Sequence, residues 1–139
     1  MLDLTQKRDA HIDHRLREDL IMWLGSVRPD GRPHLTPVWF LWNGTDLVIF
    51  SKPHQQKIRN LRQNRRVIVA LDGADRGAIV LEGEAELLDD PAVNATLPEY
   101  LAKYGPHIEG IGYTPKAMAE TYSQAIRITP TKLYDAPTA

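Results

Sequence analysis

Hydrophobic and polar positions alternate with two different periods in the first third of the chain. Over residues 5–19 apolar residues recur at every fourth position, which predicts an amphipathic helix with Thr5 as a candidate N-cap. The next two segments, 20–27 and 33–42, are short and mostly apolar, and the turn sequence RPDGR lies between them. Proline and Asp-Gly suit a tight turn, so these segments predict two strands of a hairpin.

The rest of the chain continues as strands and is interrupted by two helical regions. An Asn-Gly turn follows the second strand, and this dipeptide suits a tight hairpin connection. We then predict a strand over 47–51 and a helix over 54–64, which Pro53 could open at its first position. A strand over 65–72, a loop over 73–77 and a strand over 78–90 follow. The segment 91–122 is predicted to hold helices separated by a bend at Gly105, Gly110 and Gly112, and a last strand covers 124–135.

This order predicts a mainly β (α+β) fold. Six antiparallel strands would form a small closed or split β-barrel with flanking helices, an arrangement that leaves few strand edges unpaired. A β-sandwich is the other architecture compatible with the same periodicity. With 139 residues, the chain fits a single domain spanning residues 1–139.

Composition and charge exclude several classes of function. The formal net charge is −1, so bulk electrostatics favour neither a nucleic-acid partner nor a membrane partner. The sequence contains no cysteine, which removes disulfides, thiolate nucleophiles and cysteine-ligated zinc and fits a reducing compartment. The N-terminus has no signal-peptide pattern, and the longest apolar runs are too short to span a bilayer. We therefore expect a cytoplasmic protein.

Positive charge is concentrated between residues 50 and 67. This segment, FSKPHQQKIRNLRQNRRV, holds six lysine or arginine residues and no acid. Ser51 and Lys52 end a predicted strand, and Lys57 and Asn60 lie one turn apart on the helix that follows. A helix N-terminus attracts anions, so the junction predicts a phosphate-binding cradle without a glycine-rich loop. The alternative is an ordinary solvated helix face.

The second strand carries large apolar residues on both faces. Val38, Phe40 and Trp42 alternate with Trp39 and Leu41, so neither face of this strand is suited to water. One face would meet the core. The other would be covered by a partner subunit at a dimer interface or by a flat aromatic cofactor.

Catalytic and metal-binding patterns are weak. His11 and His14 lie three residues apart on a polar helix, but no carboxylate completes a ligand set, so we predict no metal site. There is no G-x-S-x-G motif and no dinucleotide-binding fingerprint. We therefore assign no catalytic side chain.

Three stretches resemble a known family: LGSVRPDGRPHLTPVWFLWNG, LVIFSKPHQQKIRNLRQNRRVIVAL and AIVLEGEAEL. They are similar to the pyridoxamine 5′-phosphate oxidase-like split-barrel flavin-binding proteins, and more narrowly to the branch that uses the deazaflavin F420. The resemblance implies a six-stranded split barrel and a homodimer with cofactor sites at the interface. It implies that Ser51, Lys52, Lys57 and Asn60 hold the cofactor phosphate and that the backbone around Pro37, Val38 and Trp39 lines its ring.

The resemblance also implies an oxidoreductase that transfers a hydride between F420 and a small organic substrate. An FMN-binding flavin reductase or oxidase is the first alternative, and a non-catalytic cofactor or haem carrier is the second. The chain lacks the C-terminal arginine-containing segment of pyridoxamine phosphate oxidase itself, so vitamin B6 oxidation is not expected. Gln55 stands where some deazaflavin-using relatives carry a further basic residue.

Overall fold

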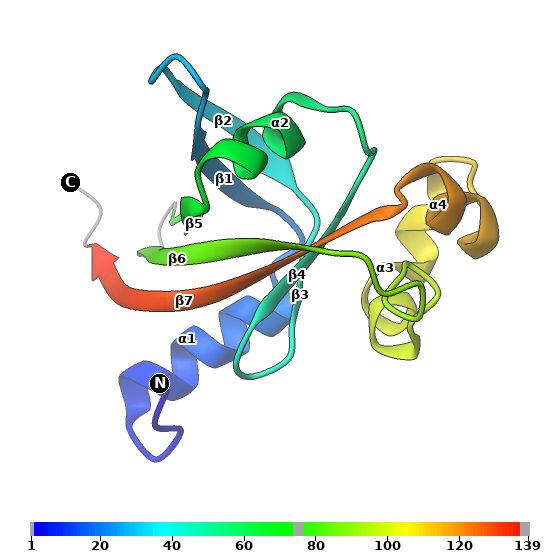
Figure 1. The fold of residues 1–139 in the computed structure, drawn as a ribbon. Helices are drawn as coiled ribbons and strands as arrows, with labels where there is room; N and C mark the ends of the chain where they lie inside the picture. Colours follow the sequence, from blue (N-terminus) through cyan, green and yellow to red (C-terminus); the bar gives the residue numbers. More distant parts are fainter. Residues whose placement is uncertain (1, 74–76, 137–139) are drawn as a thin grey trace.

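The computed structural model describes residues 2–73 and 77–136 as one antiparallel sheet with four helices around it. In Figure 1 the long β6–β7 pair crosses the molecule, with α3 and α4 at one end and α1 and the end of β7 towards the other. The elements are α1 (Lys7–Glu18), β1 (Met22–Val27), β2 (Pro33–Val38), β3 (Leu41–Trp42), β4 (Leu47–Ser51), α2 (Gln56–Gln63), β5 (Arg66–Leu71), β6 (Ala78–Leu88), α3 (Pro98–Gly110), α4 (Pro115–Thr121) and β7 (Gln124–Ala136).

The sheet is curled into a half-barrel. Its strand order is β2-β1-β5-β6-β7-β4-β3, so β2 and β3 are its two edges, yet only Trp39 and Phe40 separate them in sequence. Seven flat strands spaced by about 4.8 Å would hold these edges roughly 29 Å apart. Three peptide units reach only about 11 Å, so the sheet has to curl. This confirms the predicted mainly β, antiparallel split barrel with flanking helices.

The strand count is seven, because the predicted strand 33–42 is interrupted. Strand β2 pairs with β1 and β3 pairs with β4, so the pairing partner changes at Trp39 and Phe40. The backbone of Phe40 is satisfied by α3 instead: its N–H donates to the Tyr104 hydroxyl at 2.9 Å, and its carbonyl accepts from Lys103 Nζ at 2.9 Å. The prediction of one continuous strand was therefore wrong at these two residues.

Two apolar clusters lie on opposite faces of the sheet. The larger one fills the half-barrel and includes Leu24, Phe40 and Ile126, together with Ile12 of α1. The second lies between the other face and α3–α4 and includes Phe50 and the buried tyrosines of α3. This second cluster covers the outer face of β4, which is why all five residues of that strand are buried.

The first two helices begin later than predicted. The N-cap of α1 is Gln6, and the Thr5 hydroxyl instead donates to the Asp3 carboxylate at 2.6 Å, so Thr5 is not the N-cap. The N-cap of α2 is Gln55, so Pro53 precedes the helix and is not its first residue. In both places a local turn comes before the helix.

The segment 91–122 contains two helices, but its first seven residues form turns. Helix α3 continues through Gly105 and ends at Gly110, so the predicted bend is confined to the residues after it, where Gly112 adopts φ 84°. The predicted loop 73–77 lies partly outside the described residues. Within the described ranges, none of the helices is long and apolar enough to cross a membrane.

Candidate functional site

The junction between β4 and α2 places Ser51 inside the protein. Strand β4 lies between β7 and β3 and ends at Ser51, whose side chain is only 1% exposed. Its hydroxyl lies 2.9 Å from the carbonyl of Lys52 and 3.3 Å from Oε1 of Gln55. Ser51 therefore lies at the end of the strand beside Gln55, the N-cap of α2, and its contact with a phosphate stays a prediction.

Lys57 is a buried cation. Its side chain is 8% exposed, and Nζ donates a hydrogen bond to Oε1 of Gln55. No carboxylate of the described residues forms an ion pair with it. Burial lowers the pKa of Lys57 from its usual value, because charge is less well solvated there than in water. A buried ammonium with a neutral partner is suited to receive an anion.

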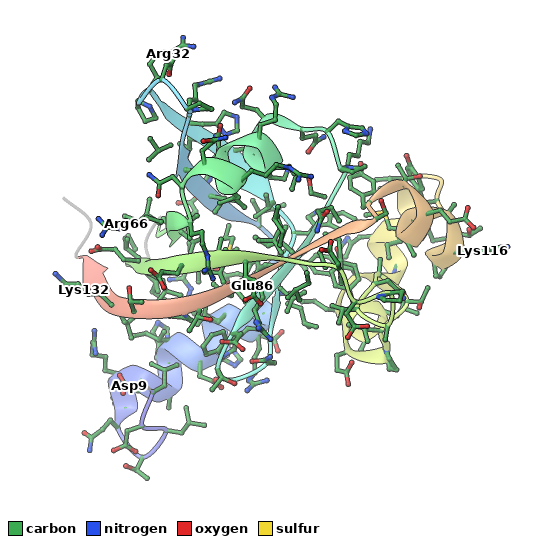
Figure 2. The ribbon with its side chains drawn as sticks, viewed as in Figure 1. Asp9, Arg32, Arg66, Glu86, Lys116 and Lys132 are labelled. Atoms are coloured by element: carbon green, nitrogen blue, oxygen red, sulfur yellow. The ribbon has the colours of Figure 1, made fainter. Side chains whose placement is uncertain are left out.

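Several other basic side chains point outward. Figure 2 shows Arg32 at the tip of the β1–β2 hairpin and Lys116 on α4, both directed away from the body of the protein. Arg62, Arg65 and Arg66 are exposed, as predicted. Lys57 therefore differs from the surrounding basic residues in being enclosed.

Asn60 is fully buried and makes internal hydrogen bonds. Its Nδ2 donates to Ser26 Oγ at 3.0 Å, and its Oδ1 accepts from Gln56 Nε2 at 2.7 Å. The bond to Ser26 holds α2 against β1, and the bond from Gln56 lies within the helix. In this structure Asn60 thus orients the helix that carries Lys57, and its contact with a phosphate stays a prediction.

Lys52 lies at the rim of the junction. It is exposed, and its Nζ lies 5.6 Å from the centre of the Tyr122 ring, just after α4. A cation–π contact of this kind contributes about 0.5–1 kcal/mol at an exposed site. Lys52 therefore adds positive charge beside the buried side chains of Ser51 and Lys57.

His34 lies on the inner face of β2 opposite Ser26. Its Nδ1 is buried and has no hydrogen-bond partner among the described residues. Burial, followed by the charges of Arg28 and Lys57, lowers the pKa of His34 from its usual value. The ring therefore stays neutral at pH 7.

The segment predicted to line a cofactor ring lies between the two clusters. Pro37 is exposed, Val38 packs into the barrel core, and Trp39 is half-buried. The indole of Trp39 stacks on the Tyr104 ring, with centroids 4.6 Å apart and planes 5° apart. Helix α3 of the same chain therefore covers part of this face. From the sequence we considered only a partner subunit or a cofactor as the group that covers this face.

An aromatic wall connects the two predicted halves of the site. Trp39 contacts Tyr104, Tyr104 lies 4.9 Å from Tyr100, and Tyr100 lies 4.9 Å from Phe50. Phe50 immediately precedes Ser51. The tyrosines are spaced four residues apart in YLAKY, a spacing that places both on one helix face and could have revealed the wall.

Lys103 of α3 was missed by sequence reasoning. Its Nζ donates to the carbonyls of Phe40 at 2.9 Å and Leu16 at 3.4 Å, and it lies 3.8 Å from the centre of the Phe40 ring. Burial lowers the pKa of Lys103 to about 8, and the nearby acids Asp19 and Glu18 oppose the shift. This lysine fastens α3 to the segment that joins β2 and β3.

Chemically, the junction is suited to binding and not to nucleophilic attack. Both contacts of the Ser51 hydroxyl are oxygens, and neither belongs to a general base. The hydroxyl of Ser51 and the ammonium of Lys57 both lie against Oε1 of Gln55, the N-cap of α2. Such donors suit the oxygens of a phosphate.

Comparisons with known proteins identify the family of this chain. The family described as pyridoxamine 5′-phosphate oxidase matches residues 9–136. The chain belongs to this family. A search of curated proteins found no match.

Solved structures share the family fold. An F420 reductase has 25% sequence identity and a TM-score of 0.70, covering 88% of this chain and 94% of that one. The conserved hypothetical protein Rv2991 from Mycobacterium tuberculosis has 23% identity and a TM-score of 0.70, with 92% and 83% covered. The haem storage protein HutZ from Vibrio cholerae has 16% identity and a TM-score of 0.65, with 91% and 93% covered. The last two show likeness of fold alone.

Proposed function

We propose that this member of the pyridoxamine 5′-phosphate oxidase family binds F420 and transfers a hydride between its ring and a small organic substrate. The observation that carries the proposal is the buried Lys57, which meets a neutral oxygen and no carboxylate among the described residues. The F420 reductase at 25% identity supports the choice of cofactor. A chain without cysteine fits the cytoplasm, where we place this activity.

Each residue at the junction has a separate role in this proposal. Lys57 supplies charge, Ser51 supplies a hydroxyl donor, and the first turn of α2 supplies backbone N–H groups to the phosphate. Lys52 adds charge at the rim, and Asn60 keeps α2 in position. These donors fit a ribityl phosphate.

The ring would lie along Pro37, Val38 and Trp39. Tyr104 supports the indole of Trp39 from behind, and α3 and α4 keep water from that side of the strand. When bound, the cofactor supplies the hydride chemistry at its ring. The chain then has to orient and desolvate the reactants, which agrees with its lack of an assigned catalytic acid or base.

FMN is the second candidate, in a flavin reductase or oxidase. It presents the same ribityl phosphate but lacks the polyanionic tail of F420. The neutral Gln55 at the start of α2 favours the shorter ligand, because it offers no charge to such a tail. A non-catalytic carrier of a cofactor or haem is the remaining alternative, and tight binding without turnover would identify it.

We further propose a homodimer with the cofactor sites at its interface. The outer face of β1, β2 and β5 exposes Trp23, Leu35 and Ile68, and Leu35 is 65% exposed. A groove of about 610 Å³ is lined in part by Leu35 and Ile68. A second copy of the chain is the occupant that the family resemblance favours. Sedimentation should give a dimer for the wild type and a monomer for Leu35→Glu, and a monomeric wild type would refute this part.

The test is a fluorescence titration with F420 and, separately, with FMN. We expect micromolar or tighter binding of F420 to the wild type. Loss of a hydrogen bond to a charged group costs about 1.5–3 kcal/mol, so Lys57→Ala should bind about 10- to 100-fold more weakly. The matched control is Lys116→Ala, an exposed lysine on α4, which should stay within about twofold. Absence of binding by the wild type, or equal affinities for wild type and Lys57→Ala, would refute the proposal.

A further inference from the structure

The side chain of Gln55 has an unusual position at the start of α2. Gln55 is the N-cap residue, with φ −74° and ψ 162°, but its side chain makes no capping hydrogen bond. Its carboxamide turns towards the interior instead. There Oε1 accepts from Lys57 Nζ and lies 3.3 Å from Ser51 Oγ.

Two buried polar groups therefore face one oxygen, and the Ser51 hydroxyl also lies 2.9 Å from the carbonyl of Lys52, its shorter contact. Ser51 comes from the end of a strand and Lys57 from the first turn of a helix, and both are more than nine-tenths buried. An ammonium and a hydroxyl that face the same oxygen are what a phosphate oxygen would meet in the same place. The oxygen of Gln55 is neutral, so it satisfies the geometry of these donors without cancelling the charge of Lys57.

We infer that the carboxamide oxygen of Gln55 stands in for a phosphate oxygen in the ligand-free chain and has to leave when the cofactor phosphate binds. The inference rests on the proposed function, because it concerns the same cradle. Gln55 is only half-buried and lies in the short connection between β4 and α2. Rotation of its side chain can therefore clear the position without any rearrangement of the strand or the helix.

A stand-in and a positioning residue have opposite consequences when they are removed. A stand-in competes with the phosphate, so its loss strengthens binding. A residue that held Lys57 in the binding geometry would weaken binding when lost. A carboxylate at the same position would pair with Lys57 more strongly than the carboxamide does and would also repel the phosphate.

The experiment measures dissociation constants for FMN, F420 and riboflavin by fluorescence. Gln55→Ala and the bulkier Gln55→Leu both remove the oxygen, so each should bind FMN and F420 about 3- to 10-fold more tightly than the wild type. Gln55→Glu should bind both at least about 10-fold more weakly. Riboflavin, which lacks the phosphate, should bind all four proteins within about twofold. The control Gln63→Ala changes an exposed glutamine of the same helix and should match the wild type.

The outcomes separate the two proposals. If the wild type binds FMN or F420 but neither Gln55→Ala nor Gln55→Leu binds more tightly, the stand-in role is refuted and the cofactor site survives. An equal gain for riboflavin would also refute it, because the effect would not concern the phosphate. If neither the wild type nor any variant binds any of these ligands, the proposed function and this inference both fail.

Discussion

The hydroxyl group of Tyr104 is expected to be a large single contributor to stability. Tyr104 is fully buried, and its hydroxyl accepts from the Phe40 N–H at 2.9 Å and donates to the Leu20 carbonyl at 2.7 Å. The substitution Tyr104→Phe keeps the ring and its stacking on Trp39 and removes only the hydroxyl, with these two bonds and its 3.1 Å contact to the Phe40 carbonyl, which still accepts from Lys103. It therefore isolates the polar contribution from the packing contribution.

The size of the stability loss in Tyr104→Phe follows from what each hydrogen-bond partner of the hydroxyl loses. The N–H of Phe40 lies where β2 gives way to β3, so without the hydroxyl it is a buried donor with no acceptor, at a cost of about 1–3 kcal/mol. Leu20 is exposed, so water can replace the lost bond to its carbonyl at little cost. We expect Tyr104→Phe to lower the free energy of unfolding by about 2–3 kcal/mol.

Urea denaturation followed by tryptophan fluorescence measures this difference. The midpoint should fall while the m-value stays unchanged, since the substitution alters stability and not the surface exposed on unfolding. Tyr122→Phe is the matched control: this half-buried tyrosine makes ring contacts to Tyr113 and Lys52 and should lose less than about 0.5 kcal/mol. A loss below about 0.5 kcal/mol for Tyr104→Phe, or an equal loss in the control, would refute the reasoning.

Three further predictions concern stability. A Cβ on Gly83 would lie 2.7 Å from the backbone oxygen of Thr129, so Gly83→Ala should cost about 1–3 kcal/mol in urea denaturation. A Cβ on Gly105, inside α3, would meet open space, so Gly105→Ala should raise the free energy of unfolding by about 0.5–1 kcal/mol. Equal effects of the two substitutions would contradict the account. Burial lowers the pKa of Lys103 to about 8 from 10.5, so between these pH values the unfolded chain holds a proton that the folded chain has lost. The unfolding free energy of the wild type relative to Lys103→Met should therefore rise with pH across this window, and a flat or falling difference would refute the assignment.

Local pattern was sufficient to predict most strands and the curled sheet. In β6, Glu82, Glu84 and Glu86 alternate with Leu81 and Ala85, which are buried, so the alternation along the sequence matches the two faces of this strand. Such alternation reports which face is covered, but it does not report which neighbour a strand pairs with. The break between β2 and β3 was missed for this reason.

The features missed at the site depend on contacts between distant parts of the chain. The backbone of Phe40 is satisfied by side chains of α3 more than sixty positions away, and no local pattern contains that information. The burial of Asn60 likewise depends on Ser26 in β1. Sequence predicted that charge and amide groups gather at the β4–α2 junction, but it could not predict that Gln55 would turn inward to meet them.

The most direct test of the central claim is whether Lys57 recognises the phosphate itself. The measurement compares dissociation constants for FMN and riboflavin, which differ only in that group, in the wild type and in Lys57→Ala. The wild type should prefer FMN by at least about 10-fold, and most of this preference should disappear in Lys57→Ala while riboflavin binding stays the same. A preference for FMN that survives the substitution, or no preference in the wild type, would contradict a phosphate site at the β4–α2 junction.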